Sequence, residues 1–400
     1  MKKKLKIALF TYSTKPRGGV IHTIELAEAL HAEGHQVCIY ALNKDNVGFH
    51  RPLNCPSKLV PTQPIIETDK LRQKQQGLDP VDELIKQRIQ EFIDFLSMEI
   101  TEYDIYHAQD CISSNALKVL RDQEIIPHFI RTVHHIDQFN SPYLQKCHDR
   151  SIIEPDLCLC VAQYWQQELK KQYHVDAPVI FNGVDLARFS NQANGKEIKL
   201  RQKLGISNYP VYLTIGGIEP RKNSLNLLQA FIRALNTYPA AQLIIAGGET
   251  LFDYEPYRIE FFNLVKEHNI TIGKSLILPG VIADQYLPTL YRCADAFVFP
   301  SIKEGWGLVL LEAIASGLPI ITSNILPFTE FLDRNSALLV NPNSIPEITD
   351  AMVNILNKNL SQKLINNASL LPPQYSWQKS AQLHLKQYSW LLSNTYNNSI

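Results

Sequence analysis

The chain has 400 residues, of which 45% are hydrophobic and 20% are charged, and Lys plus Arg balance Asp plus Glu at 39 each. This length exceeds what one hydrophobic core usually supports, so two domains are expected. A formal net charge of zero creates no overall field that would attract nucleic acid, so any anion site must be local. The seven cysteines are scattered, and Cys158 and Cys160 lie on alternate positions of a predicted strand, which indicates reduced thiols rather than a metal site.

The amino terminus briefly resembles a targeting segment. Lys2, Lys3, Lys4 and Lys6 precede apolar residues, but the apolar run ends at Phe10 and is too short for the core of a signal peptide. No apolar stretch approaches the roughly 20 residues that a membrane-spanning helix needs. We therefore expect a cytoplasmic protein without a transmembrane segment, with at most weak contact between the lysines and anionic lipid.

Predicted strands and helices alternate in the first half of the chain. Residues 5–11 and 37–41 read as buried strands, and apolar side chains at helical spacing over 21–30 place a helix between them. Because this is a βαβ unit, we expect parallel strands with helices on the faces of the sheet. The pattern continues with a long helix at 84–96 and strands at 105, 129–133 and 157–161.

A domain boundary is expected where this alternation breaks. Residues 178–189 combine a short predicted strand with a Gly turn, and a polar, lysine-rich stretch follows over 191–203. We therefore place one α/β domain at 1–184 and a second at 185–374.

The second domain repeats the alternation of strands and helices. Its elements are expected at 211–215, 225–235 (a helix), 243–246, 276–278, 296–299, 320–322 and 337–340. The last helix, about 377–392, follows Pro372 and Pro373. We expect this carboxyl-terminal segment, 375–400, to pack back on the first domain.

The loop after the fourth strand of the second domain carries the strongest chemical signal. It reads PSIKEGWGLVLLEAIASGLP, with Glu304 in the loop, Gly305 and Gly307 freeing the backbone, and a helix from about Leu308. The amide groups and dipole at a helix start form an anion site suited to a diphosphate. Glu312 lies one turn deeper on the face of Leu308, where it can accept hydrogen bonds from ribose hydroxyls. A nucleotide sugar fits two carboxylates that flank an anion site, although a solvated loop acid and an ordinary helix residue are the alternative interpretation.

Two further loops follow predicted strands. The segment IGGIEPRKN offers Arg221 and Lys222 to neutralise a leaving diphosphate, with a solvated basic turn as the alternative. In the first domain, TVHHIDQF places His134 directly after a strand, although a lone histidine is more often structural. His135 is expected to point elsewhere.

Weaker candidates also lie after strands of the first domain. His107 and Asp110, in YDIYHAQD, are possible acceptor-side residues, and Gly18 and Gly19 precede a helix that could approach donor phosphates or the acceptor. The chain has no full GxGxxG motif and no serine nucleophile elbow, which argues against an oxidoreductase and against a serine hydrolase.

The segment that carries Glu304 and Glu312 resembles the Glu-x7-Glu signature of retaining glycosyltransferases of the family 4 type. The wider group of retaining glycosyltransferases with the GT-B fold includes sucrose synthase, bacterial glycogen synthases and phosphatidylinositol mannosyltransferases. RGGV near the amino end is similar to the family's Gly-rich first loop, and FNGVD at 181–185 matches its interdomain segment. The resemblance therefore covers nearly the whole chain and implies the GT-B fold, two Rossmann-like doubly wound parallel-sheet domains that face a central cleft.

The resemblance also implies roles for individual residues. Glu304 is expected at the donor sugar, Glu312 at the ribose, Lys222 at the phosphates, and His134 at the donor sugar or reacting centre. The backbone amides expected to meet the sugar and phosphates belong to Gly305, Trp306, Gly307 and Leu308.

Two nucleotide-side positions complete the predicted site. Gly217 stands where the family commonly has an arginine, so Arg221 is the candidate substitute. Val281 lies in the segment 279–282, whose backbone is expected to read the base. Asn182, Gly183 and Asp185 are expected to be architectural.

The predicted function is transfer of a sugar from a nucleotide diphosphate sugar to an unidentified acceptor, in carbohydrate biosynthesis, with retention at the anomeric carbon. No Asp-x-Asp pair occurs in the chain, so we expect neither a metal ion nor another cofactor, and no nucleic-acid partner. One alternative is a nucleotide-sugar epimerase or hydrolase on the same fold, which would consume donor without forming a glycoside. The other is a catalytically silent glycan-binding protein, which would bind no nucleotide diphosphate.

Overall fold

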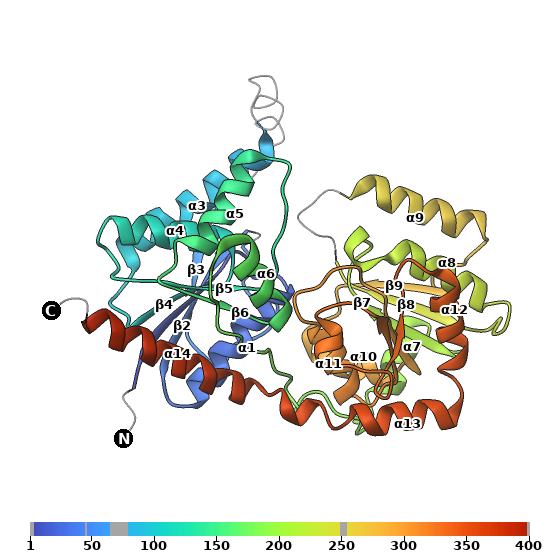
Figure 1. Cartoon of the computed structure of the whole chain (residues 1–400). Coiled ribbons are helices and arrows are strands. Elements are labelled where there is room, and N and C mark those ends of the chain that lie inside the picture. Colours follow the sequence, from blue (N-terminus) through green and yellow to red (C-terminus); the bar gives the residue numbers. More distant parts are fainter. Residues whose placement is uncertain (1–3, 45, 65–78, 249–253, 398–400) are drawn as a thin grey trace. The chain divides into compact units, whose positions relative to one another are not determined.

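The computed structural model describes residues 4–44, 46–64, 79–248 and 254–397. The chain divides into two compact units (Figure 1). Unit 1 comprises Met1–Asn182 and Trp377–Ile400, and unit 2 comprises Gly183–Ser376. Each unit contains a parallel sheet with helices on both faces, as the doubly wound α/β prediction requires.

Unit 1 is built on a six-stranded sheet with the order β3-β2-β1-β4-β5-β6, and its strands pair in parallel. The strands are β1 (Lys6–Thr11), β2 (Gln36–Asn43), β3 (Ser57–Pro61), β4 (Ile105–Ala108), β5 (Ile130–Val133) and β6 (Leu157–Cys160). The helices are α1 (Gly18–Ala32), α3 (Pro80–Glu99), α4 (Cys111–Asp122), α5 (Pro142–Ile153), α6 (Gln163–Tyr173) and α14 (Trp377–Asn397). In Figure 1, α3, α4 and α5 lie together on one face of the sheet, whereas α1 and α14 pack together on the other.

Burial on both faces explains why the central strands of unit 1 are continuously apolar. In β1, all five residues after Lys6 are buried, as expected for a parallel strand covered by helices on both sides. Helix α3 starts where Asp79 accepts a hydrogen bond from the amide of Val81 and Pro80 occupies the first turn. Its apolar stripe, centred on Phe92, then packs into the core beneath the sheet.

Three features of the chain differ from the sequence prediction. The edge strand β3 was not predicted, because its short segment is flanked by prolines and mostly exposed. The strand expected within 178–189 is reduced to isolated bridges that Val179 and Val184 make with Cys160 and Ser376. The lysine-rich stretch that followed it forms helix α7 (Glu197–Leu204). All seven cysteines are free thiols.

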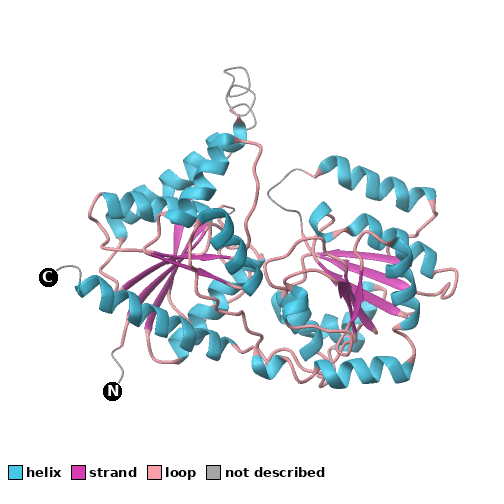
Figure 2. Ribbon diagram, viewed as in Figure 1, coloured by secondary structure: helices cyan, strands magenta, loops and turns pink. Residues whose placement is uncertain are grey.

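Unit 2 repeats the architecture with a six-stranded sheet of order β12-β11-β10-β7-β8-β9, again paired in parallel. Figure 2 shows helices on both faces of this sheet. The strands are β7 (Val211–Ile215), β8 (Gln242–Ala246), β9 (Leu276–Gly280), β10 (Ala296–Phe299), β11 (Ile320–Ser323) and β12 (Leu338–Val340). The α-helices besides α7 are α8 (Ser224–Ala234), α9 (Glu255–Glu267), α10 (Leu287–Arg292), α11 (Leu308–Ala315), α12 (Ile345–Asn354) and α13 (Lys358–Ala368). Four short 3-10 helices are η1 (Pro220–Lys222), η2 (Asp284–Tyr286), η3 (Phe328–Glu330) and η4 (Pro372–Gln374).

The core of unit 2 is closed by helices α8 and α12 against the sheet. Phe231 of α8 and Met352 of α12 are fully buried in one apolar cluster with Tyr212 of β7. The Tyr212 hydroxyl donates a 2.7 Å hydrogen bond to the carbonyl oxygen of Met352, so the one polar atom of this large side chain is satisfied inside the core.

The last helix, α14, is tied to the sheet of unit 1 by a buried polar contact. Tyr388 and His107 are both fully buried, and the hydroxyl of Tyr388 lies 2.8 Å from Nδ1 of His107. The other ring nitrogen of His107 lies 2.8 Å from Oγ1 of Thr132. Within the described residues, no helix combines the length and apolarity needed to cross a bilayer.

This contact predicts the effect of removing one oxygen atom. Tyr388→Phe keeps the aromatic ring but leaves a buried nitrogen of His107 without its partner, so we expect a loss of about 1–3 kcal/mol of stability. The melting temperature and the urea midpoint would measure it, with Tyr209→Phe as the matched control because Tyr209 is 57% exposed. Equal effects of the two substitutions would show that the contact adds no stability.

Candidate functional site

Three of the charged residues predicted for the second domain lie in two loops at the carboxyl edge of the unit 2 sheet. Arg221 and Lys222 lie in η1, after β7, and Glu304 lies in the loop after β10, which pairs directly with β7. Backbone bonds join the loops, because the Ile302 amide donates to the Arg221 carbonyl at 3.0 Å. The side chain of Asn223 likewise donates to the carbonyl of Pro300 at 3.0 Å.

Glu304 is the centre of a compact charged group. One of its oxygens, Oε1, lies 2.5 Å from Nζ of Lys222 and 2.7 Å from Nη1 of Arg221, and it also accepts a 3.0 Å hydrogen bond from the Ser301 hydroxyl. Burial by itself would raise the pKa of Glu304, but Lys222 and Arg221 outweigh it and lower the pKa to about 2. Burial lowers the pKa of Lys222, and Glu304 opposes that shift. The carboxylate is therefore ionised at neutral pH.

A second carboxylate completes the charge balance of this group. Arg221 also lies 3.2 Å from Glu219, which is buried and stands two residues before it in the same motif. The two cations thus face two carboxylates. An arriving anion would compete with Glu304 and Glu219 for the same positive charges.

Glycines bring the backbones of two neighbouring loops into contact. A Cβ atom on Gly217 would lie 2.5 Å from the carbonyl oxygen of Gly248, and one on Gly247 would lie 2.4 Å from the carbonyl carbon of Gly216. The arginine that the resemblance places at Gly217 therefore has no room on this backbone. Val281, which is 57% exposed, follows β9 and packs its side chain over Gly248.

Helix α11 presents its amino end in the same loop as Glu304. Gly307 adopts a φ of 110°, a conformation that side-chain-bearing residues rarely take, and it precedes Leu308, the first helical residue. Gly307, the residue at the N-cap, has no side chain that could cap the first turn of the helix. Trp306 is 2% exposed and packs its ring on Phe331, so its side chain faces the interior and the donor-binding prediction for this residue concerns its backbone only.

Glu312 is held in orientation by a buried tyrosine. The hydroxyl of Tyr291 donates a 2.8 Å hydrogen bond to Oε2 of Glu312. The ring of Tyr291 is fully buried and packs edge-on against Phe189 and, tilted, against Phe297. One oxygen of the carboxylate is therefore fixed from inside the unit.

In unit 1, His134 lies directly after β5, as predicted. Its Nε2 atom is 3.3 Å from Oε1 of Gln109, and a Cβ atom on Gly19 would meet its ring at 3.6 Å, whereas one on Gly18 would meet nothing within 4 Å. Burial, with smaller contributions from neighbours that include His22, lowers the pKa of His134 well below its ordinary value. The ring is therefore neutral at pH 7.

The two weaker acceptor-side candidates have structural roles. His107 is fully buried with both ring nitrogens engaged, as described above, so it presents none to a substrate. Asp110 caps α4 and accepts hydrogen bonds from the backbone amides of Tyr12 at 2.7 Å and Ser113 at 2.8 Å. Nε2 of His135 lies 2.8 Å from a carboxylate oxygen of Asp137.

Several residues of these sites were not predicted. Glu219 and Ser301 stand inside the motifs that were singled out, so their polar side chains were a usable signal. Tyr291 reaches Glu312 from another helix, which no local pattern indicates. In unit 1, His22 donates to Asn182 at 2.8 Å and packs edge-on against His134, so Asn182 supports a site residue.

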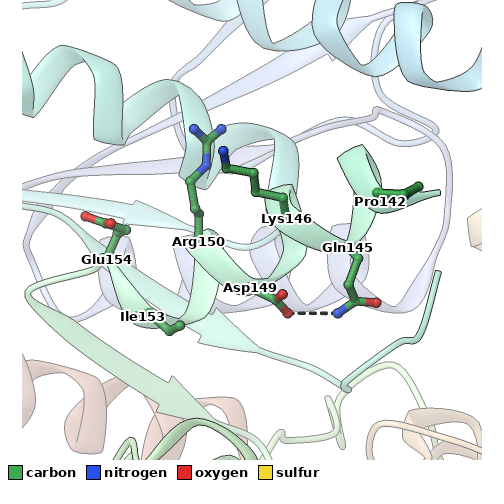
Figure 3. A pocket seen from close by; sticks show the side chains of 7 residues that line it. All are labelled: Pro142, Gln145, Lys146, Asp149, Arg150, Ile153 and Glu154. Atoms are coloured by element: carbon green, nitrogen blue, oxygen red, sulfur yellow. Dashed lines mark hydrogen bonds between the residues drawn. The ribbon is translucent and has the colours of Figure 1, made fainter. Parts of the chain in front are cut away.

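A separate pocket runs along α5 (Figure 3). It is lined by residues between Pro142 and Glu154, and Gln145 donates a 2.8 Å hydrogen bond to Asp149 there. None of the predicted site residues lines it. Among the described residues, no group of three or more His, Cys, Asp or Glu side chains is placed to hold a metal ion.

Comparisons with known proteins agree with this architecture. Residues 16–188 match the family model described as Glycosyltransferase Family 4, and residues 196–370 match Glycosyl transferases group 1. The O-antigen chain mannosyltransferase B of Escherichia coli is 26% identical over 66% of this chain and 70% of its own length. The alpha-monoglucosyldiacylglycerol synthase of Streptococcus pneumoniae is 28% identical over 79% of this chain and 70% of its own length.

Solved structures show the same fold. Anabaena HepE in complex with UDP and glucose superposes with a TM-score of 0.75 at 18% identity, over 96% of this chain and 99% of that one. Sucrose-phosphate synthase from Thermosynechococcus elongatus gives 0.75 at 22% identity, over 98% and 100%. The two doubly wound sheets and these matches define a glycosyltransferase with the GT-B fold, which confirms the predicted fold and enzyme class. The chain belongs to the glycosyltransferases of the family 4 type.

The charged group around Glu304 predicts a pH-dependent stability. Because the pKa of Glu304 is lowered from 4.5 to about 2, its ionised form stabilises the fold fully above about pH 4.5 and progressively less as the pH falls toward 2. Glu304→Gln should therefore destabilise the protein most near pH 7, and the difference from wild type should shrink below pH 4.5. Urea midpoints between pH 3 and pH 7 would measure this, with the exposed Glu267→Gln as control. A difference that stays constant or grows in acid would contradict the assignment.

Proposed function

We propose that this glycosyltransferase transfers a sugar from a nucleotide diphosphate sugar to an acceptor hydroxyl, with retention at the anomeric carbon and without a metal ion. The observation that carries the proposal is the cationic group of Lys222 and Arg221 on Glu304, in the loop that leads through Gly307 into the start of α11. Cationic side chains and helix-start amides together suit a diphosphate. The structure of Anabaena HepE with UDP-glucose supports a donor of this class.

Binding of the donor exchanges the partners of the charged group. The diphosphate binds Lys222 and Arg221, and both side chains neutralise its charge as it leaves. Arg221 replaces the arginine that has no room at Gly217. Glu304 gives up these cations and turns to the donor sugar. A divalent ion is then not needed, because the side chains of Lys222 and Arg221 supply the positive charge that neutralises the diphosphate.

The nucleoside of the donor is recognised by the carboxylate of Glu312 and by the residues that follow β9. Glu312, oriented by Tyr291, accepts hydrogen bonds from the ribose hydroxyls. Val281 and its neighbours after β9 contact the base, and the backbone of Gly305 through Leu308 contacts the sugar and phosphates. Gly217 allows the close approach of the loops that carry these groups.

Transfer is a substitution at the anomeric carbon. The bond from this carbon to the diphosphate oxygen breaks, the bond to the acceptor oxygen forms on the same face, and the acceptor proton passes to the leaving phosphate oxygen. Positive charge develops on the sugar ring as in an oxocarbenium ion, where the ionised Glu304 stabilises it. His134, neutral at pH 7 and with Gly19 packed on its ring, is assigned to the donor sugar or the reacting centre.

We further propose a cytoplasmic location, supported by the free thiol state of all seven cysteines, which suits a reducing compartment. Weak contact of the amino-terminal lysines with anionic lipid remains a prediction. The proteins to which the chain is similar are named as transferases and synthases, which does not favour an epimerase, a hydrolase or a silent binding protein.

The first test is a thermal-shift screen of nucleoside diphosphates and their sugars, repeated in excess EDTA. A ligand at a hundred times its Kd stabilises by about 2.7 kcal/mol, which identifies the donor. We expect the shift, and transfer to any acceptor found, to persist in EDTA. Activity that is lost in EDTA and restored by Mg²⁺ or Mn²⁺ would overturn the metal-free mechanism. If no nucleotide is bound by the folded protein, the proposed function itself is wrong.

The second test separates the two glutamates. Ribose hydrogen bonds exist in the ground and transition states alike, so Glu312→Gln should raise the donor KM with little change in kcat. Tyr291→Phe should do the same more weakly, because it removes only the hydrogen bond that orients Glu312. Glu304→Gln should lower kcat by about a hundredfold, and Lys222→Ala should weaken diphosphate binding and turnover. Initial rates and calorimetry would measure these effects, with Glu267→Gln as control, and reversed signatures would refute the roles.

A further inference from the structure

The ammonium group of Lys222 has a second partner besides the carboxylate of Glu304. Its nitrogen, Nζ, lies 4.6 Å from the centre of the Phe299 ring, well inside the distance of about 6 Å at which an aromatic face attracts a cation. Phe299 is the last residue of β10 and is 1% exposed. The ammonium group therefore lies over a buried ring as well as 2.5 Å from an oxygen of Glu304.

The stem and backbone of this lysine are also held in place. A Cβ atom on Gly216 would lie 3.1 Å from each of three stem carbons of Lys222, Cγ, Cδ and Cε, which is closer than side chains normally pack. The amide of Lys222 donates to the carbonyl of Glu219 at 3.1 Å. The next residue is anchored as well, because the side chain of Asn223 donates to the carbonyl of Pro342 at 2.6 Å. Packing thus sets the path of the lysine, which reduces the side-chain entropy lost when an anion binds.

The ring of Phe299 is itself held by two other buried rings. It stacks on Phe297 with ring centres 5.8 Å apart and an interplanar angle of 25°, and it packs tilted against Phe328, also at 5.8 Å. Phe328 in turn packs against Gly307, where an added Cβ atom would come within 3.0 Å of its ring. These contacts connect Lys222 to the residue that precedes α11. Packing therefore fixes where the cation lies relative to the start of that helix.

The two partners of the ammonium group differ in what they do to its charge. The carboxylate of Glu304 neutralises Lys222 and so competes with an arriving phosphate. The ring of Phe299 attracts the ammonium group through its quadrupole and carries no net charge, so it does not neutralise the cation. In the proposed function, Glu304 turns from the lysine to the donor sugar. Lys222 then keeps one fixed partner and still presents its full charge to the diphosphate.

We propose that Phe299 is a positioning residue of the transfer reaction, whose ring face holds the ammonium group of Lys222 in place while the diphosphate replaces Glu304 as its anionic partner. The inference rests on the proposed function and adds to it a residue that acts on the donor through Lys222. A packing role for Phe299 is the alternative interpretation. The two differ in a measurable way, because packing depends on the shape of the ring, whereas attraction of a cation depends on the electron density of its face.

Fluorinated phenylalanine at position 299 separates the two roles. Ring fluorines withdraw electron density from the aromatic face and change the shape of the ring little. Calorimetry with UDP, GDP and ADP first identifies the diphosphate that wild type binds most tightly, and this probe is then used for the variants. With one, two and three fluorine atoms on Phe299, we expect a stepwise loss of affinity that reaches about tenfold. The same series at Phe231, which packs on Tyr212 in the core of unit 2, is the control and should leave the affinity unchanged.

The pKa of Lys222 gives a second readout that needs no nucleotide. An aromatic face stabilises the charged form of the lysine, so each fluorine on Phe299 should lower the pKa of Lys222 in the free protein. NMR of lysines labelled with 13C at Cε measures it, with the signal assigned by its absence in Lys222→Ala. A constant pKa, a constant diphosphate affinity, or an equal loss of affinity in the control series would each overturn the proposal and leave the transferase function standing. If wild type binds none of the three diphosphates, the proposed function is wrong and this proposal fails with it.

Discussion

The parallel direction of the strands is the constraint on which the rest of this structure depends. All the pairings recorded in both sheets are parallel, so every strand must be followed by a crossover that returns the chain to the opposite edge. Strand interiors are consequently covered on both faces and apolar, and polar side chains collect where strands end. This is why Lys222 meets Glu304 across 82 positions of sequence, and why Tyr12 meets Asp110 across 98.

In the charged group of unit 2, two cations at such an edge are compensated by carboxylates of the same unit. Glu304 and Glu219 neutralise the two cations, so the buried charges of this group are paired. In the proposed function, donor binding would exchange one anion for another.

The sequence predicted those parts of the fold in which local pattern and burial coincide. Strands such as β7 and β10 are continuous apolar runs, which predict buried strands. The glycines before α11 indicate where that helix begins. The edge strand β3 lacks such a run, and the segment at 178–189 is apolar enough for a strand but pairs only through single bridges.

In the site, the positions of Glu304 and Lys222 at strand ends followed from the alternation of elements. Three features of the site did not follow from it: the inward direction of Trp306, the engagement of both ring nitrogens of His107, and the tyrosine that hydrogen-bonds Glu312. Each depends on a partner far along the chain.

The packing of α14 on α1 has a consequence for how the protein is made. Synthesis delivers α1 and the whole unit 1 sheet first, then all of unit 2, and only then the helix that supplies Tyr388 to His107. Until that moment the face of the sheet around α1 lacks its cover, so the earliest part of the chain to emerge from the ribosome is the last to reach its native packing.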